Sequence, residues 1–444
     1  MCSQFHRLSL MLLVGAALQA NMASSQQSEV EIGMDRSNMA TEWTIAPPGE
    51  PNIYPFNGPY NGPGVFQARR LAVFDGVTRM HPQWFRDGFG PDKPENVQLF
   101  VDMVKQVHSR NMKLLAVVGP TSADFEKSDI LTPEQSGCQW STYPLSKIDL
   151  GKFSKRIRTY FGAVKTAGLS VDAFEIGNEL DLYCNDADMP KTSEFAAHQW
   201  KWFLSDRQVH AFAAGYVPFL KTFTGLIREY FPNARIITFG MSNPTGNSAP
   251  LIAALANFKD SSGHVFDYTT LVDGYGTHIY PPSDTTQHMV DSATRNLTAQ
   301  AAVFPHRGEK PIWITEWSES GAAFWSSHKW YFQYDARGKV GGDLNLAGGG
   351  YPAMPRSRAI VAFRRDVIAR LRAQADPVDV RYLFYYSYDS VAKSDMCDAT
   401  GFNTSRGIKG QCYSGVIDPV NGDLLKDVAG ALAPEPAHEP HPVR

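Results

Sequence analysis

Short apolar runs alternate with longer segments of helical periodicity along most of this 444-residue chain. A run that is apolar throughout predicts a strand buried on both faces, and repeated strand-helix units predict a parallel sheet. Eight such strands can be counted. They are "VEIGMD" ending at Asp35, "GVTRM" ending near Arg79, "KLLAVVG" at Lys113–Gly119, "DAFEIGNE" ending at Glu179, "RIITFGMS" from Arg235, "VDGYGTHIY" ending at Tyr280, "PIWITEW" from Pro311 and "VRYLFYYSY" from Val380.

Helical segments lie between these strands. They are expected at about Asn96–Arg110, Gly151–Ala167, Ala211–Tyr230, His288–Val303, Ser357–Ala373 and Gly422–Leu432. Eight strands, each followed by a helix, predict one α/β domain, a closed (β/α)8 TIM barrel with long loops on the C-terminal face. No apolar pattern remains for a second domain, so we expect the barrel to span residues 26–432, before a Pro-rich tail at 433–444.

The first 25 residues resemble a secretory signal peptide. His6 and Arg7 precede an apolar run, Leu8–Leu18, and small residues follow at Ala20–Ser25. The run is too short for a membrane anchor, so we expect a secreted or periplasmic protein without membrane contact. The net charge of -3, with no basic block, argues against nucleic acid or anionic lipid as a partner. We expect a monomer.

Four cysteines remain once the predicted signal peptide with Cys2 is removed. An even number in an exported chain favours two disulfides, and four cysteines allow three pairings. We favour Cys138 with Cys184 and Cys397 with Cys412, because each pair would join neighbouring loops; free buried thiols are the alternative. No CxxC or HxxxH spacing indicates a metal site, and we expect no cofactor.

Two glutamates stand at the ends of predicted strands. Glu179 closes the fourth strand in "FEIGNEL" and Glu316 closes the seventh in "WITEWSES", so both should project from one face of the barrel. A carboxylate at the end of an apolar strand is costly unless it is paired, neutralised or exposed in a pocket. Hydrolysis of a glycosidic bond needs such a pair, one as acid and one as carboxylate. Either residue alone could instead be an ordinary surface glutamate.

A family resemblance rests on three short motifs and the chain's ending. "GNE" after an apolar strand, "GTHIY", "ITEW" about 137 positions after "GNE", and "GVIDPVNGDLLKDVAGAL" resemble the glycoside hydrolases of clan A. These barrel enzymes carry catalytic glutamates at the ends of strands four and seven. The resemblance implies a retaining β-glycosidase in which Glu179 is the acid/base and Glu316 is the nucleophile. It also implies that Asn178 binds the hydroxyl next to the anomeric carbon.

The resemblance extends to other groups around the nucleophile. Tyr280 would hold Glu316, with His278 nearby, and Arg79 on the second strand would keep Glu316 ionised. The clan's strand-eight tryptophan is absent from "FYYSYDS", so Tyr386 or Tyr388 would form the floor of the sugar site.

Other aromatic and acidic residues receive weaker interpretations. Trp43, Trp84 and Trp317 are candidate sugar platforms, each with ordinary packing as the alternative. By strand alternation Glu175 points to the same side as Glu179, and we interpret it as a barrel-interior partner of a cation such as Arg79. Glu319 and Asp181 are expected in loops near the rim.

The expected substrate is a polysaccharide or oligosaccharide. "FEIGNELD" leans toward xylosidases and glucuronidases of families 39 and 79, but no trailing β-sandwich is expected, which leans toward a compact endo-glycanase. We favour an endo-β-glycanase of the glucanase type, with an exo-acting β-xylosidase or β-glucuronidase as the alternative. From another class, a carbohydrate-binding barrel without turnover remains open. A metal-dependent hydrolase would need a His and Asp cluster that the sequence lacks.

Overall fold

The computed structural model describes eleven segments of the chain. They are residues 29–36, 71–89, 93–191, 204–242, 248–319, 323–326, 329–332, 354–388, 410–412, 415–417 and 423–433, without residues 72, 139, 260, 261, 284 and 307. The predicted signal peptide, Trp43, Cys397 and nearly all of the predicted tail lie outside these residues. The signal peptide, the tail and the second disulfide therefore stay predictions.

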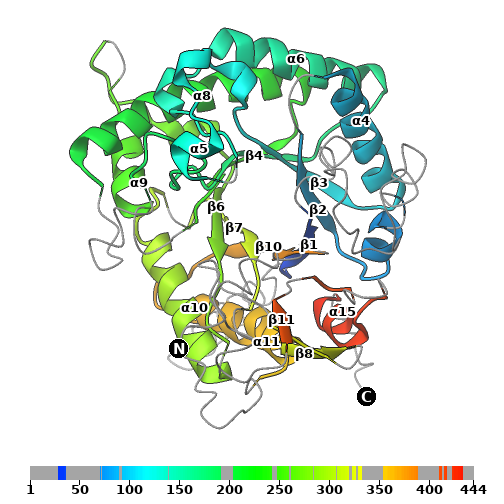
Figure 1. The fold of residues 1–444 in the computed structure, drawn as a ribbon. Coiled ribbons are helices and arrows are strands. Elements are labelled where there is room, and N and C mark those ends of the chain that lie inside the picture. The colour runs from blue at the N-terminus through cyan, green and yellow to red at the C-terminus, as the bar shows by residue number, and fades with distance from the viewer. Residues whose placement is uncertain are drawn as a thin grey trace, which may run out of the picture.

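Eight parallel strands form the predicted barrel (Figure 1). They are β1 Glu31–Asp35, β2 Trp84–Gly88, β3 Lys113–Val118, β4 Ala173–Asn178, β5 Arg235–Gly240, β6 Tyr275–Ile279, β7 Ile312–Trp317 and β10 Val380–Tyr386. Their hydrogen-bonded order is β5-β4-β3-β2-β1-β10-β7-β6. Two parallel bridges, Ile237 with Gly274 and Met241 with Thr277, join β5 to the β6 side, so the ring nearly closes. The (β/α)8 fold is confirmed.

Helices surround the barrel (Figure 1). The labelled α-helices are α4 Pro94–Ser109, α5 Pro133–Ser136, α6 Leu150–Thr166, α8 Asp206–Tyr230, α9 Ser248–Ala256, α10 Thr286–Ala301, α11 Arg356–Ala362, α12 Ile368–Arg372 and α15 Lys426–Leu432. A π-helical turn, Phe363–Val367, joins α11 to α12, and 3-10 turns lie at Ser122–Asp124, Lys127–Asp129, Leu145–Lys147 and Tyr268–Leu271. Local caps explain several starts: the Asp149 side chain accepts from the first turn of α6, and Ser205 forms a capping box with Gln208 at α8.

The second predicted strand was misplaced. Residues 73–78 are helical, and Arg79 lies exposed in the turn that follows, while the true strand β2 begins at Trp84. The buried hydrophobic residues of this segment are Val73, Phe74, Val77 and Met80. Their spacing of three and four is that of a helix facing the core, so the helical period was read as a strand.

The barrel interior has two layers. The lower layer, which is the one nearer the N-terminal ends of the strands, is apolar. It consists of Trp84, Leu115, Ala173, Ile237, Trp313, Tyr382 and Phe384. Its rings pack closely, with the centroids of Trp313 and Tyr382 3.5 Å apart. Successive inward residues on a strand are two positions apart, so the next layer toward the C-terminal ends contains Asp35, Arg86, Glu175 and Thr315. The apolar layer thus supports a buried polar layer.

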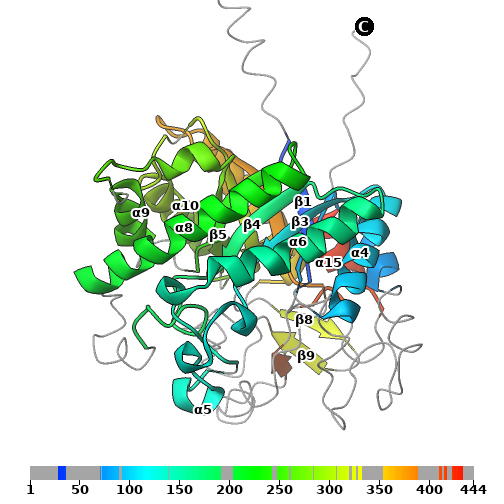
Figure 2. The ribbon, with the colours of Figure 1, turned by 90° about the horizontal axis from the view of Figure 1, so that it is seen from above.

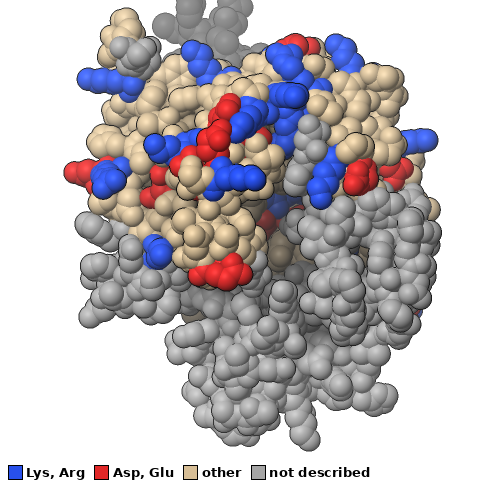
Figure 3. Space-filling view, turned by 45° about the horizontal axis from the view of Figure 1, so that its top comes forward, with Lys and Arg blue, Asp and Glu red and all other residues tan. Residues whose placement is uncertain are grey.

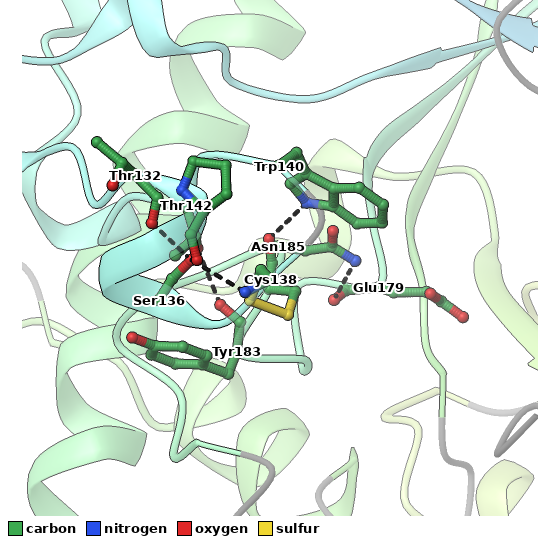
Figure 4. The surroundings of a disulfide bond; sticks show 10 residues. Thr132, Ser136, Cys138, Trp140, Thr142, Glu179, Tyr183 and Asn185 are labelled. Atoms are coloured by element: carbon green, nitrogen blue, oxygen red, sulfur yellow. Dashed lines mark hydrogen bonds between the residues drawn. A yellow bond between two sulfur atoms is a disulfide. The ribbon is translucent and has the colours of Figure 1, made fainter. Parts of the chain in front are cut away.

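Additional elements lie beyond one end of the barrel. The small sheet of β8 Ala323–Ser326, β9 Lys329–Phe332 and β11 Gly410–Cys412 lies at the same end as α5 (Figure 2). The predicted disulfide between Cys138 and Cys184 is confirmed and joins the loop after β3 to the loop after β4 (Figure 4). Within the described part of the chain, no helix has the length and apolar character needed to cross a membrane.

Candidate active site

Arg86 on β2 lies at the centre of the polar layer and is 1% exposed. Its Nε donates to Glu175 Oε2 at 2.7 Å, and its Nη1 donates to Asp35 Oδ2 and Glu316 Oε1, each at 2.7 Å. Burial alone would lower the pKa of Arg86, but Glu175, Asp35 and Glu316 outweigh it and raise the pKa well above its usual value. One permanently charged guanidinium on β2 therefore links side chains from three other strands, β1, β4 and β7.

The cation expected near Glu316 exists, but it is Arg86 and not Arg79. Arg79 was assigned from the misplaced strand, and its exposed position after residues 73–78 puts it outside the barrel interior. The strand "WFRDG" contains two charges and so lacks the apolar run that marks the other strands. The sequence signal for this strand was a spacing of two: Trp84 and Arg86 are two positions apart, as are Ala173 and Glu175 on β4, so the members of each pair face the same side. Glu175 is the interior partner of a cation, as predicted, with Arg86 in that place.

Glu316 lies at an irregular point of β7. The pairing of β7 shifts register against both neighbours between Ile314 and Trp317. Thr315 and Glu316 consequently both reach interior groups: Thr315 Oγ1 donates to Glu175 Oε1 at 2.9 Å, while Glu316 is bonded to Arg86. Trp317 points the other way, is 1% exposed and stacks on Phe363 of the π-helical turn at 4.3 Å. Its predicted role as a sugar platform is wrong.

Tyr280 holds the second oxygen of Glu316. Its hydroxyl donates to Glu316 Oε2 at 2.6 Å. Burial, reinforced by the charge of Glu316, raises the pKa of Tyr280 well above its usual value, so the phenol remains a donor. The ring of Tyr386 meets that of Tyr280 edge to face at 6.2 Å and is half-buried, whereas Tyr388 is buried. Of the two candidates for the floor, Tyr386 lies beside the site.

Glu179 is placed by a turn at the end of β4. Gly177 has φ 96° and Glu179 has φ 47°, a left-handed conformation that costs a side-chain-bearing residue about 1–2 kcal/mol. The turn is held by the Glu179 N–H donating to the Gly240 carbonyl at 2.9 Å and by Asn185 Nδ2 donating to the Glu179 carbonyl at 3.2 Å. The Glu179 side chain is 22% exposed, compared with 8% for Glu316.

His278 on β6 lies between the acidic groups. Its Nδ1 is 2.9 Å from Glu179 Oε1 and 3.5 Å from Glu316 Oε2, and its Nε2 is 3.7 Å from Glu175 Oε1. Burial alone would lower the pKa of His278, but Glu316, Glu175 and Glu179 raise it to about 10. The imidazole is therefore charged at neutral pH and Nδ1 donates to Glu179.

A glycine on β5 makes room for this ring. A Cβ at Gly240 would lie 2.1 Å from His278 Nε2 and 2.4 Å from Glu175 Oε1, so no larger residue fits without displacing one of them. Gly240 was not identified from the sequence, because a glycine in "TFGMS" gives no chemical signal.

Asn178 contributes an amide to the same group. Its Oδ1 accepts from Arg86 Nη2 at 2.6 Å, which leaves the Nδ2 amino group to donate to a ligand. Asp35, whose oxygen also binds Arg86, was missed because it ends the short strand "EIGMD" without a distinctive motif. Burial, opposed by Arg86 and reinforced by Glu316, raises the pKa of Asp35 well above its usual value.

One further expectation is wrong, and two residues expected in loops are buried there. Trp84 lies in the apolar lower layer, 1% exposed, with its indole N–H donating to Glu31 Oε2 at 2.7 Å, so it cannot be a sugar platform. Glu319 and Asp181 lie in the loops after β7 and β4, as expected, but both are buried: Glu319 is bonded to Arg356, and Asp181 accepts from Ser242. Burial, reinforced by Glu179, raises the pKa of Asp181 to about 6 despite the hydrogen bonds from Ser242.

Glu179, His278 and Glu316 are close enough to act together. One oxygen of each glutamate and a nitrogen of His278 all lie within 4.8 Å of one another. A cation could be held at that spacing, but Arg86 and Tyr280 already donate to the two oxygens of Glu316, and two positive side chains adjoin the group. The arrangement suits proton transfer and nucleophilic attack better than metal binding.

Comparisons with known proteins give only distant likenesses. No family model and no curated protein sequence matches the chain. Its structure is similar to an exo-β-1,4-mannosidase from Opitutaceae bacterium strain TAV5, with TM-score 0.48, 13% identity and 91% of this chain covered. This chain spans 58% of the length of that protein. A GH5-4 broad specificity endoglucanase from Clostridium acetobutylicum gives TM-score 0.49 and 10% identity, over 91% of this chain and 97% of the other.

Proposed function

We propose that the chain is a retaining glycoside hydrolase that cleaves β-linked carbohydrate by double displacement. The observation that carries the proposal is the short separation, within 4.8 Å, between an oxygen of Glu179 and one of Glu316 at the same end of the barrel. Retaining enzymes place their two carboxyl groups about 5–5.5 Å apart, whereas inverting enzymes need about 6.5–9.5 Å to admit a water.

The surroundings of the two glutamates divide their roles. Glu316 accepts from Arg86 and Tyr280, which orient it and suit its charged form, so it is the proposed nucleophile. Glu179 is the more exposed of the two and accepts from His278 through Oε1, so Oε2 can carry the proton that the leaving oxygen receives. Asn178 Nδ2 would donate to the hydroxyl next to the anomeric carbon.

The proposed reaction has two steps. Glu316 attacks the anomeric carbon while Glu179 protonates the glycosidic oxygen, which leaves with the released sugar. Glu179, now a carboxylate, removes a proton from water, and that water attacks the anomeric carbon and frees Glu316. The permanent charge of Arg86 compensates Glu316 whenever it is a free carboxylate.

Within this class we propose an exported endo-β-glycanase of the glucanase type. An exo-acting β-xylosidase or β-glucuronidase is the alternative. The products formed early in the digestion of a reduced polysaccharide distinguish the endo-acting from the exo-acting enzyme. An endo-acting enzyme lowers viscosity rapidly and releases mixed oligosaccharides, whereas an exo-acting enzyme releases one small sugar while viscosity changes little.

The catalytic assignment is tested with aryl β-glycosides and β-glucan, xylan and mannan. We expect hydrolysis by the wild type, a loss of about 10³-fold or more in kcat for Glu316→Gln, and wild-type rates for Glu309→Gln, an exposed control. For Glu179→Ala, azide should restore part of the activity on aryl glycosides with good leaving groups, since these need no acid. Inactivity of every form on every substrate would exclude the enzyme, and full activity of Glu316→Gln would exclude the assignment.

A further inference from the structure

Trp140 is an exposed tryptophan with its polar group already bonded. It is 52% exposed, and the other large exposed hydrophobic residues in the described part of the chain are Val265 and Val361. The Trp140 indole N–H donates to the Cys184 carbonyl at 2.7 Å. What the residue offers to solvent is therefore apolar ring surface, which a ligand can cover without displacing a hydrogen bond.

The loop that carries Trp140 is tied to the loop after β4. The Cys138–Cys184 disulfide crosses between them, and Thr142 Oγ1 donates to the Tyr183 carbonyl at 2.9 Å. The Ala187 N–H donates to the Tyr143 carbonyl at 3.0 Å. These links hold the indole in place before any ligand arrives, so little conformational freedom is lost when the ring is covered.

The same links connect Trp140 with the proposed acid. Cys184, which accepts from Trp140, precedes Asn185, and Asn185 Nδ2 donates to the carbonyl of Glu179. Figure 4 shows Trp140, Asn185 and Glu179 as neighbours in this arrangement, with the Glu179 carboxylate directed away from the disulfide. Glu316 comes from β7, three strands further round the barrel.

We propose that Trp140 is a platform for a sugar ring on the leaving-group side of the cleaved bond. This inference rests on the proposed function, because Glu179 must contact the oxygen at which the leaving sugar begins. The released part of the substrate then extends past Glu179 along the β3 and β4 loops, where Trp140 stands. The C–H face of a sugar ring would cover the indole while its hydroxyls remain in solvent.

The kinetic test compares two substrates with the same sugar on the glycone side. One is an aryl β-glycoside, and the other is an oligosaccharide with several sugars on the leaving-group side. For Trp140→Ala we expect kcat/KM to fall about tenfold more for the oligosaccharide than for the aryl glycoside, with most of the change in KM. Trp140→Phe should recover part of the loss because it keeps a ring, and Val265→Ala, also exposed and apolar, should behave as the wild type.

Equal losses on both substrates, or no loss on either, would overturn the platform. A direct binding measurement tests the platform independently of the proposed reaction. In the Glu316→Gln background, calorimetry should show the oligosaccharide binding about tenfold more weakly when Trp140→Ala is added. Unchanged binding would refute the platform, whereas weaker binding would support it even if the wild type hydrolysed nothing, an outcome that would refute the proposed function alone.

Discussion

At the scale of single residues, the site depends on one guanidinium shared by three carboxylates. Arg86 bonds Asp35, Glu175 and Glu316 from different directions, and it also holds the amide of Asn178. An ammonium group is a point charge without the planar fork that lets arginine serve several acceptors at once. The chemistry of the site therefore depends on the shape of this side chain as well as on its charge.

Arg86→Lys tests that dependence. We expect kcat/KM on an aryl glycoside to fall by about 100-fold or more, because Glu316 and Asn178 cannot both keep their donor. The control is Arg365→Lys on the surface, which should keep wild-type rates. Wild-type activity in Arg86→Lys would show that positive charge alone suffices.

The glycine beneath His278 gives a second residue-scale prediction. Gly240→Ala should lower both stability and activity, because the added methyl group overlaps the imidazole and the Glu175 carboxylate. We expect a loss of about 1–3 kcal/mol in the free energy of unfolding, measured with urea. Gly225→Ala in α8 is the matched control: its Cβ would meet open space, and alanine favours a helix by about 1 kcal/mol. Similar effects of the two changes would contradict the proposed overlap.

At the scale of elements, the sequence predicts strands well where the barrel wall is apolar. Seven of the eight predicted strands lie where their apolar runs placed them. The remaining strand, β2, was missed because Arg86 is one of its inward residues. The functional side chain therefore interrupts the apolar pattern. The fold brings together the residues that the motifs predicted: Glu179, His278, Tyr280 and Glu316. Strand register and packing were needed to identify the others, Arg86, Asp35 and Gly240. Trp317 was misjudged because a register shift in β7 decides which side chains face inward.

The disulfide gives a prediction at this scale. In the chain-entropy model, a disulfide that closes a loop of 46 residues contributes about 4 kcal/mol to the free energy of unfolding. Hydrogen bonds also join the two loops, so we expect removal of the disulfide to cost less than this. The Cys138→Ser/Cys184→Ser variant should unfold at lower urea concentration than the wild type. Dithiothreitol should lower the midpoint of the wild type more than that of the variant, in which only the predicted Cys397–Cys412 bond remains to be reduced. Equal midpoints in the two proteins would show that the hydrogen bonds alone hold the loops.

At the scale of the whole molecule, the mixed charges on the face in Figure 3 contrast with a group of charged side chains buried in the barrel. On the face in Figure 3, the Lys and Arg side chains of the described residues are interspersed with Asp and Glu, in keeping with the net charge of -3. The barrel centre instead holds Arg86 and a charged His278 beside four carboxyl groups. Stability should therefore respond to pH through these buried groups.

His278 sets the direction of one such response. Its pKa is about 10 in the fold and about 6.5 in an unfolded chain, so folding favours the protonated ring. This contribution is complete below pH 6.5 and is lost as pH rises toward 10. The free energy of unfolding should fall more steeply between pH 7 and 10 in the wild type than in His278→Gln, by up to about 1.4 kcal/mol per pH unit. Parallel curves would mean that His278 is neutral in the fold.

The bonds of Arg86 also have a consequence for how the molecule assembles. The contacts of Arg86 with Asp35, Glu175 and Glu316 span 51, 89 and 230 residues of chain. Contacts so distant in sequence form late, because a long loop must be closed before they can be made. During refolding, catalytic activity should therefore return only with the slowest phase, after most helical signal has recovered. The return of catalytic activity would then indicate that the whole ring of strands has formed, and no partly assembled barrel would be active.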